Sequence, residues 1–487
     1  MDLIYRLRSI AALLGEYNEL ENQSIYFAPP EELNDPMEGF KRIFWQGDAI
    51  IWLNLFKHYF FCLHETYFLS NLADESIEFN ASLIPIFYQK NQFPTKMYEK
   101  LFEDAWQKTC EEACLKEFSD MLAEKNRKVE PNELLLYLKD LHVISLFILK
   151  GAYIENGLTT DFDSPPPLVK SMIKKIIETK AYNEINDDDE LNLNMLFDVF
   201  LKTRYQVDLI SRYNLSENVF SDNETKRPFL IFDFPQEYMV RIEELLYPKW
   251  YTACFMDTYN NSSAWGHYAS NHTGACLIFK VDNLDNKNTI NLNKITSYSG
   301  SKNSGMQKNR SFSPMGIDKV NYNQQAPEID FFRSIGWLPI PTLLKHWYSD
   351  RNKNISTCGQ HLISDGVNES WRDIYWENFM KDKTIKTNDW SYEREYRIVL
   401  HSLISDLSEK EDRVLNYDFS SLHGIIFGIK TKESEKIKIM KVIEKKCIES
   451  KRNDFKFYQA YYCKKLGNVQ KRELSLLKFE TKNNHSA

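Results

Sequence analysis

Two glutamates and an arginine alternate with other residues near the end of the chain, in the stretch WSYEREYRIVL (390–400). The alternation predicts a strand that carries Glu393, Glu395 and Arg397 on one face and core residues on the other. Two carboxylates at this spacing can share one polar ligand, with the arginine neutralising one and leaving the other for acid–base work. A row of ion pairs on a half-exposed strand explains the same residues and, for an isolated motif, is the more frequent outcome.

A second group of chemically active side chains lies in the segment SAWGHYASNHTG (263–274), just before the predicted strand GACLIFKV. Trp265, His267, Tyr268 and His272 suit the wall of a pocket for a flat polar ligand. A structural loop with its aromatic rings in the core explains them equally well. The two histidines are not at the i, i+4 helical spacing, and no cysteine or acid stands at ligand spacing, so no metal site is predicted.

A third group opens the chain, where Tyr5, Arg6 and Arg8 alternate in the apolar strand candidate LIYRLRSI. An arginine inside an apolar strand needs an anion as partner. We expect that partner to be Glu393, Glu395 or a phosphate of a ligand.

The turn Asn34-Asp35-Pro36 that follows is typical of a helix start. Asp35 is expected to cap the helix, with Pro36 at its first position. Glu38 would complete a capping box.

The elements that must position these groups fall into regions of different pattern. Residues 1–45 carry short strands and a helix, 46–247 show helical periodicity throughout, and 248–470 are β-rich. The N-terminal β piece is too small to bury its own face, so it needs the later strands as partners. The pattern predicts an α+β protein: a β-rich core built from 1–45 and 248–470, a helical insertion, and a tail from 471 to 487.

Composition narrows the function. The chain has 487 residues, a net charge of −8 and 14% aromatic residues, which argues for a folded protein and against general nucleic-acid binding. Eight cysteines without a CxxC pair, no signal-peptide pattern and no long apolar run favour a cytoplasmic protein with no membrane contact. The signatures of the dinucleotide fold, the P-loop, the hydrolase elbow and the zinc proteases do not occur.

Four motifs in order carry a resemblance to a known family: YRLRSI, IYFAPPEELNDPME, WGHYASNHTG and WSYEREYRIVL, followed by the strand GIIFGI. Together they resemble a bacterial family catalogued as domain of unknown function 2971. The family assigns no activity.

The same layout also resembles ADP-ribosyltransferases of the arginine-serine-glutamate type, in which a small split β-sandwich binds NAD in its cleft. The resemblance implies that Arg6 or Arg8 holds an NAD phosphate or ribose. It also implies that Ser262 or Ser263 stands near the middle position. AWGHYA replaces the Ser-Thr-Ser strand of that family.

By the same resemblance, Trp265, His267 and Tyr268 would surround the nicotinamide. Glu395 would be the last glutamate of the Glu-x-Glu pair, and Glu393 would orient an acceptor or take its proton.

The resemblance therefore predicts an ADP-ribosyltransferase-like or NAD-hydrolysing enzyme with NAD as substrate, and by analogy a toxin or anti-phage defence effector. The first alternative is a non-catalytic module that senses a nucleotide and contacts a partner protein through the helical insertion. A third interpretation is a metal-dependent nuclease that uses Asp257, Glu393 and Glu395.

Overall fold

The computed structural model describes residues 2–74, 77–87, 93–159, 172–179, 190–216, 226–301, 305–323, 325–363, 369–402 and 406–479. The chain divides into two compact units. Unit 1 comprises Met1–Phe40, Pro248–Pro327 and Phe379–Ala487, and unit 2 comprises Lys41–Tyr247 and Glu328–Asn378. The α+β class is confirmed. Residues 328–378, expected with the β-rich part, instead pack with the helical unit.

Unit 1 is organised by an eight-stranded sheet of order β15-β14-β13-β5-β1-β4-β11-β9. Its strands are β1 (Leu3–Arg8), β4 (Trp250–Met256), β5 (Ala275–Lys280), β9 (Asp318–Lys319), β11 (Glu395–His401), β13 (Leu422–Phe427), β14 (Lys456–Cys463) and β15 (Asn468–Glu473). The N-terminal strand β1 therefore lies in the middle, between β5 and β4. It pairs with β5 over six residues but with β4 at one position only, Tyr5 opposite Met256.

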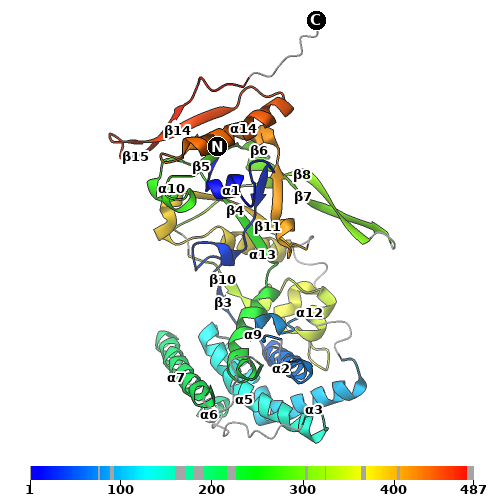
Figure 1. The fold of residues 1–487 in the computed structure, drawn as a ribbon. Coiled ribbons are helices and arrows are strands. Elements are labelled where there is room, and N and C mark those ends of the chain that lie inside the picture. The colour runs from blue at the N-terminus through cyan, green and yellow to red at the C-terminus, as the bar shows by residue number, and fades with distance from the viewer. Residues whose placement is uncertain are drawn as a thin grey trace. The chain divides into compact units, whose positions relative to one another are not determined.

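A second sheet in unit 1 has the order β2-β12-β7-β6, and β8 pairs with β7 to form a long two-stranded ribbon (Figure 1). These strands are β2 (Ser24–Tyr26), β6 (Asp282–Leu284), β7 (Lys287–Ser301), β8 (Gly305–Gly316) and β12 (Val414–Tyr417). Side chains of both sheets share one apolar core with α1 (Ile10–Leu14) and α14 (Glu433–Glu449). The other face of the large sheet is covered by α10 (Ser262–Tyr268), through Trp265.

Unit 2 is helical, with one short parallel pair of strands, β3 (Arg42–Phe44) and β10 (Glu328–Asp330). Its helices are α2 (Ala49–Leu72), α3 (Lys96–Glu112), α4 (Leu115–Lys125), α5 (Pro131–Glu155), α6 (Met172–Thr179), α7 (Glu190–Ser216), α8 (Lys226–Pro228), α9 (Phe234–Ile242), α11 (Phe331–Ser334), α12 (Ile340–His346) and most of α13 (Glu369–Lys383). Asp48 caps α2 by accepting the N–H of Ile51, and Pro131 starts α5. Within the described ranges, no helix has both the length and the apolarity to cross a bilayer.

Two fully buried histidines join the helices of unit 2. His58 Nε2 lies 2.9 Å from the carbonyl oxygen of Ile86, and its Nδ1 lies 2.8 Å from the Tyr238 hydroxyl. His142 repeats this arrangement, with Nε2 2.7 Å from the carbonyl of Leu230 and Nδ1 2.8 Å from the Tyr59 hydroxyl. A carbonyl can only accept, so each Nε2 carries the proton and each Nδ1 accepts from a tyrosine. Both rings are therefore neutral.

Burial lowers the pKa of both His58 and His142 to about 4. In the unfolded chain their pKa is about 6.5, so the unfolded state binds more protons as the pH falls. We predict that the free energy of unfolding drops by about 2 kcal/mol for each histidine between pH 7 and pH 5. Urea titrations at both pH values measure this. In His58→Gln the free energy of unfolding should fall less between pH 7 and pH 5 than in the wild type, because one titrating ring is gone. An unchanged pH dependence in that variant would contradict the assignment of a neutral His58 ring.

Candidate functional site

The strand expected from Trp390 begins later. Residues Asn388–Glu393 form a 3-10 helix, Arg394 has a left-handed backbone (φ 48°), and β11 starts at Glu395. The prediction of one strand through both glutamates is thus wrong, because the turn at Arg394 interrupts the extended backbone. The turn sends the Arg394 side chain to the surface, where it pairs with Asp257 at 2.8 Å.

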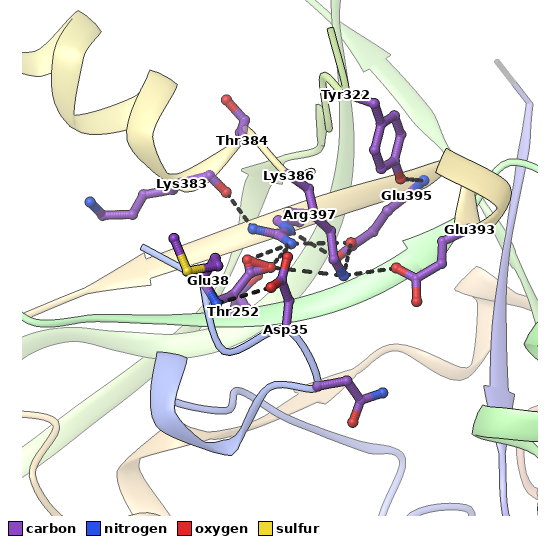
Figure 2. A network of polar contacts seen from close by, with 12 residues as sticks. Asp35, Glu38, Thr252, Tyr322, Lys383, Thr384, Lys386, Glu393, Glu395 and Arg397 are labelled. Atoms are coloured by element: carbon purple, nitrogen blue, oxygen red, sulfur yellow. Dashed lines mark hydrogen bonds and ion pairs between the residues drawn. The ribbon is translucent and has the colours of Figure 1, made fainter. Parts of the chain in front are cut away.

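Glu393 and Glu395 nevertheless meet in one buried cluster (Figure 2). Lys386 Nζ lies 2.8 Å from Glu393 and 3.2 Å from Glu395. Arg397 Nε donates to Glu395 at 2.8 Å, and its Nη2 donates to both Glu395 and Glu38. All five side chains are at most 5% exposed, so three carboxylates and two cations share a site almost without water.

Two members of this cluster were missed or misassigned from the sequence. Glu38 belongs to no helix: residues 36–39 form a turn, and its carboxylate reaches Arg397. Asp35 accepts the N–H of Met37 at 2.9 Å within that turn. Lys386 lies in the polar stretch TIKTNDW, where a single lysine has the appearance of a surface residue. Neither role has a local signal, because both depend on contacts between distant segments.

The carboxylates of the cluster differ in the direction in which their pKa values are shifted. Burial alone would raise the pKa of Glu395, but the charge and hydrogen bonds of Arg397 outweigh it and lower the pKa to about 2. Burial raises the pKa of Glu393 and of Glu38, although Lys386 and Arg397 oppose the change. Burial would lower the pKa of Lys386, but the neighbouring glutamates raise it. Glu395 is therefore the firmly ionised carboxylate, whereas Glu393 and Glu38 hold a proton more readily than an exposed glutamate does.

A cavity of about 210 Å³ opens beside the cluster. It exists because β1 and β4 separate after the Tyr5–Met256 pair, while Ala28 takes the place beside Thr252 further along β4. The separation exposes residues from both faces of the sheet to one space. Its lining includes Tyr5, Arg6, Arg8, Asn34, Glu38, Cys254, Tyr268, Lys386, Glu393, Glu395 and Arg397.

Arg6 is the unusual cation of this cavity. It is 7% exposed, its Nη2 lies 3.4 Å from the carbonyl of Tyr26, and its guanidinium stands over the Phe255 ring. Among the described residues no carboxylate pairs with it, and its buried Nη1 has no hydrogen-bond partner. Burial lowers the pKa of Arg6 to about 10, so it remains charged at neutral pH.

The glutamates expected as partners of the N-terminal arginines are engaged elsewhere. Arg8 pairs with Glu19, with Nε donating at 2.8 Å, and neither arginine contacts Glu393 or Glu395. The expectation of a carboxylate partner from the late strand is therefore wrong. Among the described residues, Arg6 therefore has a backbone carbonyl and an aromatic ring as neighbours but no carboxylate partner.

The aromatic segment contributes one side chain to the cavity. The Tyr268 hydroxyl donates to Glu393 and accepts from Asn34 Nδ2 at 3.1 Å. Trp265 is fully buried and donates its Nε1 proton to the carbonyl of Tyr259, which makes it a core residue.

Ser263, His267 and His272 also lie outside the lining. Ser263 and His267 are exposed on α10, and His267 Nδ1 lies 3.0 Å from the Tyr392 hydroxyl. His272 follows in a left-handed turn (φ 70°), with Nε2 3.4 Å from Ser262 Oγ. Of the residues expected to form a pocket wall in this segment, Tyr268 is the one that lines the cavity. The segment folds into a short helix and a turn, and the other side chains point elsewhere.

No trio of histidine, cysteine, aspartate or glutamate side chains suited to a metal ion occurs within the ranges that the structure describes. The positions between the carboxylates are taken by Lys386 and Arg397 instead. Asp257, the third residue of the nuclease interpretation, pairs with Arg394.

The structure thus defines an α+β protein with a cavity of about 210 Å³ beside a buried charge cluster. Residues 264–398 match the sequence model of a family described as a protein of unknown function (DUF2971). The match confirms the family resemblance inferred from the motifs, and it spans Tyr268, Lys386 and Glu395. Searches of curated proteins and of solved structures found no match.

The charge balance of the cluster predicts how the loss of one cation changes the stability of the protein. Lys386→Met leaves three buried carboxylates with one cation, so we expect the free energy of unfolding to fall by about 3–5 kcal/mol at pH 7. The deficit should shrink toward pH 5, because protonation of Glu38 or Glu393, whose pKa values are raised, removes the uncompensated charge.

The matched control is Lys445→Met. Lys445 also pairs with a glutamate, Glu21, but 60% of its side chain is exposed. The free energy of unfolding should therefore fall much less than in Lys386→Met. Equal losses in the two variants, measured by urea unfolding, would contradict a central role for Lys386.

Proposed function

We propose that the cavity binds NAD and that the protein is an ADP-ribosyltransferase-like or NAD-hydrolysing enzyme. The observation that carries the proposal is Arg6, a buried cation without a carboxylate, in the lining of the same cavity as Glu393 and Glu395. A phosphate of the dinucleotide would supply the missing anion, since guanidinium groups bind phosphate through paired hydrogen bonds.

The carboxylates suit the chemistry of the nicotinamide–ribose bond. That bond breaks with its electron pair leaving on nicotinamide, and positive charge develops on the ribose as in glycoside hydrolysis. The ionised Glu395 would stabilise this charge. Glu393, with its raised pKa, would accept the proton that an attacking hydroxyl or water gives up.

The arrangement of strands supports the same proposal. Two sheets share one core, and the central strands β1 and β4 separate beside the cavity. A split β-sandwich that holds NAD at its separation is the architecture expected of this class of enzyme.

One observation favours a second candidate, a module that binds a nucleotide without cleaving it. Glu395 is 2% exposed and already accepts hydrogen bonds from Arg397, Lys386 and the thiol of Cys254. A ribose hydroxyl would have to replace one of them. In that case the ligand binds and no nicotinamide is released.

Binding is tested at Arg6. Arg6→Met should weaken NAD binding at least tenfold in calorimetry, because the phosphate loses its cation. The free energy of unfolding of the same variant should be higher than that of the wild type by about 1–3 kcal/mol, because the substitution removes a buried charge that has no carboxylate partner.

Two comparisons make the result specific to the cavity. Arg6→Lys keeps the charge and should retain part of the affinity. Arg452→Gln changes another largely buried arginine of unit 1, one outside the lining, and should leave NAD binding unchanged. Wild-type affinity in Arg6→Met would refute the phosphate role.

Turnover separates the two candidates. If the protein is an enzyme, it releases nicotinamide from NAD, and Glu393→Gln and Glu395→Gln each lower the rate by about 10²–10³ by analogy with other electrostatic groups. Chromatographic detection of nicotinamide measures the rate, and urea unfolding verifies the fold of each variant. Binding without release by the wild type would favour the sensing module, and full activity in folded Glu395→Gln would remove Glu395 from catalysis.

A further inference from the structure

Residues 30–39 form a loop whose two ends lie close together. The loop begins with the short 3-10 turn Pro30–Glu32 and ends at Gly39, where a φ of 71° favours glycine. A Cβ atom added to Gly39 would lie 3.9 Å from Cβ of Pro30 and 3.1 Å from Cζ2 of Trp250. A loop of this length with adjacent ends is an Ω-loop, and such loops are frequently functional.

The loop forms part of the wall of the cavity in unit 1, because Glu32, Leu33, Asn34 and Glu38 belong to the lining. The cavity has a volume of about 210 Å³, whereas ligand pockets commonly have about 300–1,000 Å³. A dinucleotide would therefore enter only if part of this wall moves.

Few hydrogen bonds fasten residues 30–37 to the rest of unit 1. Among the described residues, the backbone N–H groups of the loop bond only within residues 29–37. Two side-chain hydrogen bonds leave this segment: Glu32 accepts from the Tyr26 hydroxyl at 3.1 Å, and Asn34 Nδ2 donates to the Tyr268 hydroxyl at 3.1 Å. A segment with so few external hydrogen bonds opens at low cost in free energy.

Asp35 does not fasten the loop, although it is buried. Its carboxylate accepts the N–H of Met37, which belongs to the same loop. The hydrogen bond therefore moves with the loop and is kept when the loop opens.

The two ends of the segment from Asn34 to Glu38 are held with different strength. Glu38 is paired with Arg397 in the buried cluster, where its side chain is 2% exposed (Figure 2). Asn34 is exposed and makes one neutral hydrogen bond, for which water competes. Breaking the buried ion pair costs far more than breaking the exposed hydrogen bond, so the loop separates first at Asn34.

We propose that residues 30–37 are a lid that opens at Asn34, while Glu38 and Gly39 stay in place, and that the Asn34–Tyr268 hydrogen bond is its latch. The Tyr268 hydroxyl accepts from Asn34, so its own proton is directed at Glu393. Closure of the lid thus positions Glu393 and encloses the ligand in one step. That the ligand is NAD rests on the function proposed above, whereas the lid does not.

Cys254 reports the opening of the lid, because its thiol lines the cavity. The rate at which N-ethylmaleimide alkylates Cys254 in the full chain, read by peptide mass spectrometry, should rise about three- to tenfold in Asn34→Ala. This is the factor expected for the loss of one hydrogen bond. Cys463, partly exposed and outside the lining, should react at an unchanged rate, and the fully buried Cys276 should stay unlabelled unless the protein unfolds.

The matched control is Asn309→Ala. Asn309 is an exposed residue of unit 1 outside the lining, and its Nδ2 donates to Ser297 at 3.2 Å and to Ser299 at 3.1 Å. Its replacement also removes exposed amide hydrogen bonds, but the labelling rate of Cys254 should stay that of the wild type.

A double-mutant cycle tests whether Asn34 and Tyr268 form the latch together. Tyr268→Phe removes the same hydrogen bond from the other side, so Asn34→Ala/Tyr268→Phe should label Cys254 no faster than Tyr268→Phe alone. Increases that multiply in the double variant would show that the two residues act independently and would overturn the latch. Labelling of Cys254 in Asn34→Ala at the wild-type rate would overturn the lid.

Release of NAD tests the lid with the ligand present. NAD should dissociate at least threefold faster from Asn34→Ala than from the wild type in stopped-flow displacement, because the open lid no longer retains it. Equal dissociation rates would overturn the role of the lid in enclosing the ligand. If calorimetry detects no NAD binding to the wild type, the proposed function fails, but labelling without ligand still decides whether the lid exists.

Discussion

The ion pairs of Arg397 hold separate segments of unit 1 together at the buried charge cluster. Its guanidinium is 1% exposed and bonds to Glu395 on its own strand, to Glu38 near the N-terminus and to the carbonyl of Lys383. Taking such a charge out of water costs several kcal/mol unless every donor is satisfied. The two ends of the chain therefore have to come together before this charge is compensated, and the positions of β11 and of residues 35–40 depend on it.

Lys386 completes the cluster by adding a second cation to three carboxylates. With all five groups ionised one negative charge would remain, and burial raises the pKa of two of the three carboxylates, Glu38 and Glu393. The tyrosine hydroxyl of Tyr322 adds a neutral contact by accepting the N–H of Glu395 at 2.8 Å (Figure 2). A cluster of this kind fixes its carboxylates in place, and fixed carboxylates are what a reaction with developing positive charge requires.

Arg6 and Arg397 are buried arginines of the same unit with opposite environments. Arg397 is surrounded by carboxylates, which raise its pKa, whereas burial without such a partner lowers the pKa of Arg6. The two line one cavity, so its walls hold one compensated and one uncompensated positive charge. In the helical unit, His58 and His142 are buried as neutral rings, and both nitrogens of each ring have a partner.

The sequence by itself determined what depends on periodicity. Alternation identified Glu395 and Arg397 as neighbours on one face of a strand, and helical spacing marked most of the region from 46 to 247. The ordered motifs indicated a resemblance to a family whose sequence model matches residues 264–398. The tertiary structure decided which distant groups meet. Glu38 and Lys386 joined the cluster, and Arg394 turned the chain before β11. The separation of β1 from β4 left Arg6 in the lining of the cavity, where no carboxylate of the described residues pairs with it. Local spacing decides which side chains share a face, but the partner of a buried charge is chosen by long-range packing, because only there is its loss of water compensated.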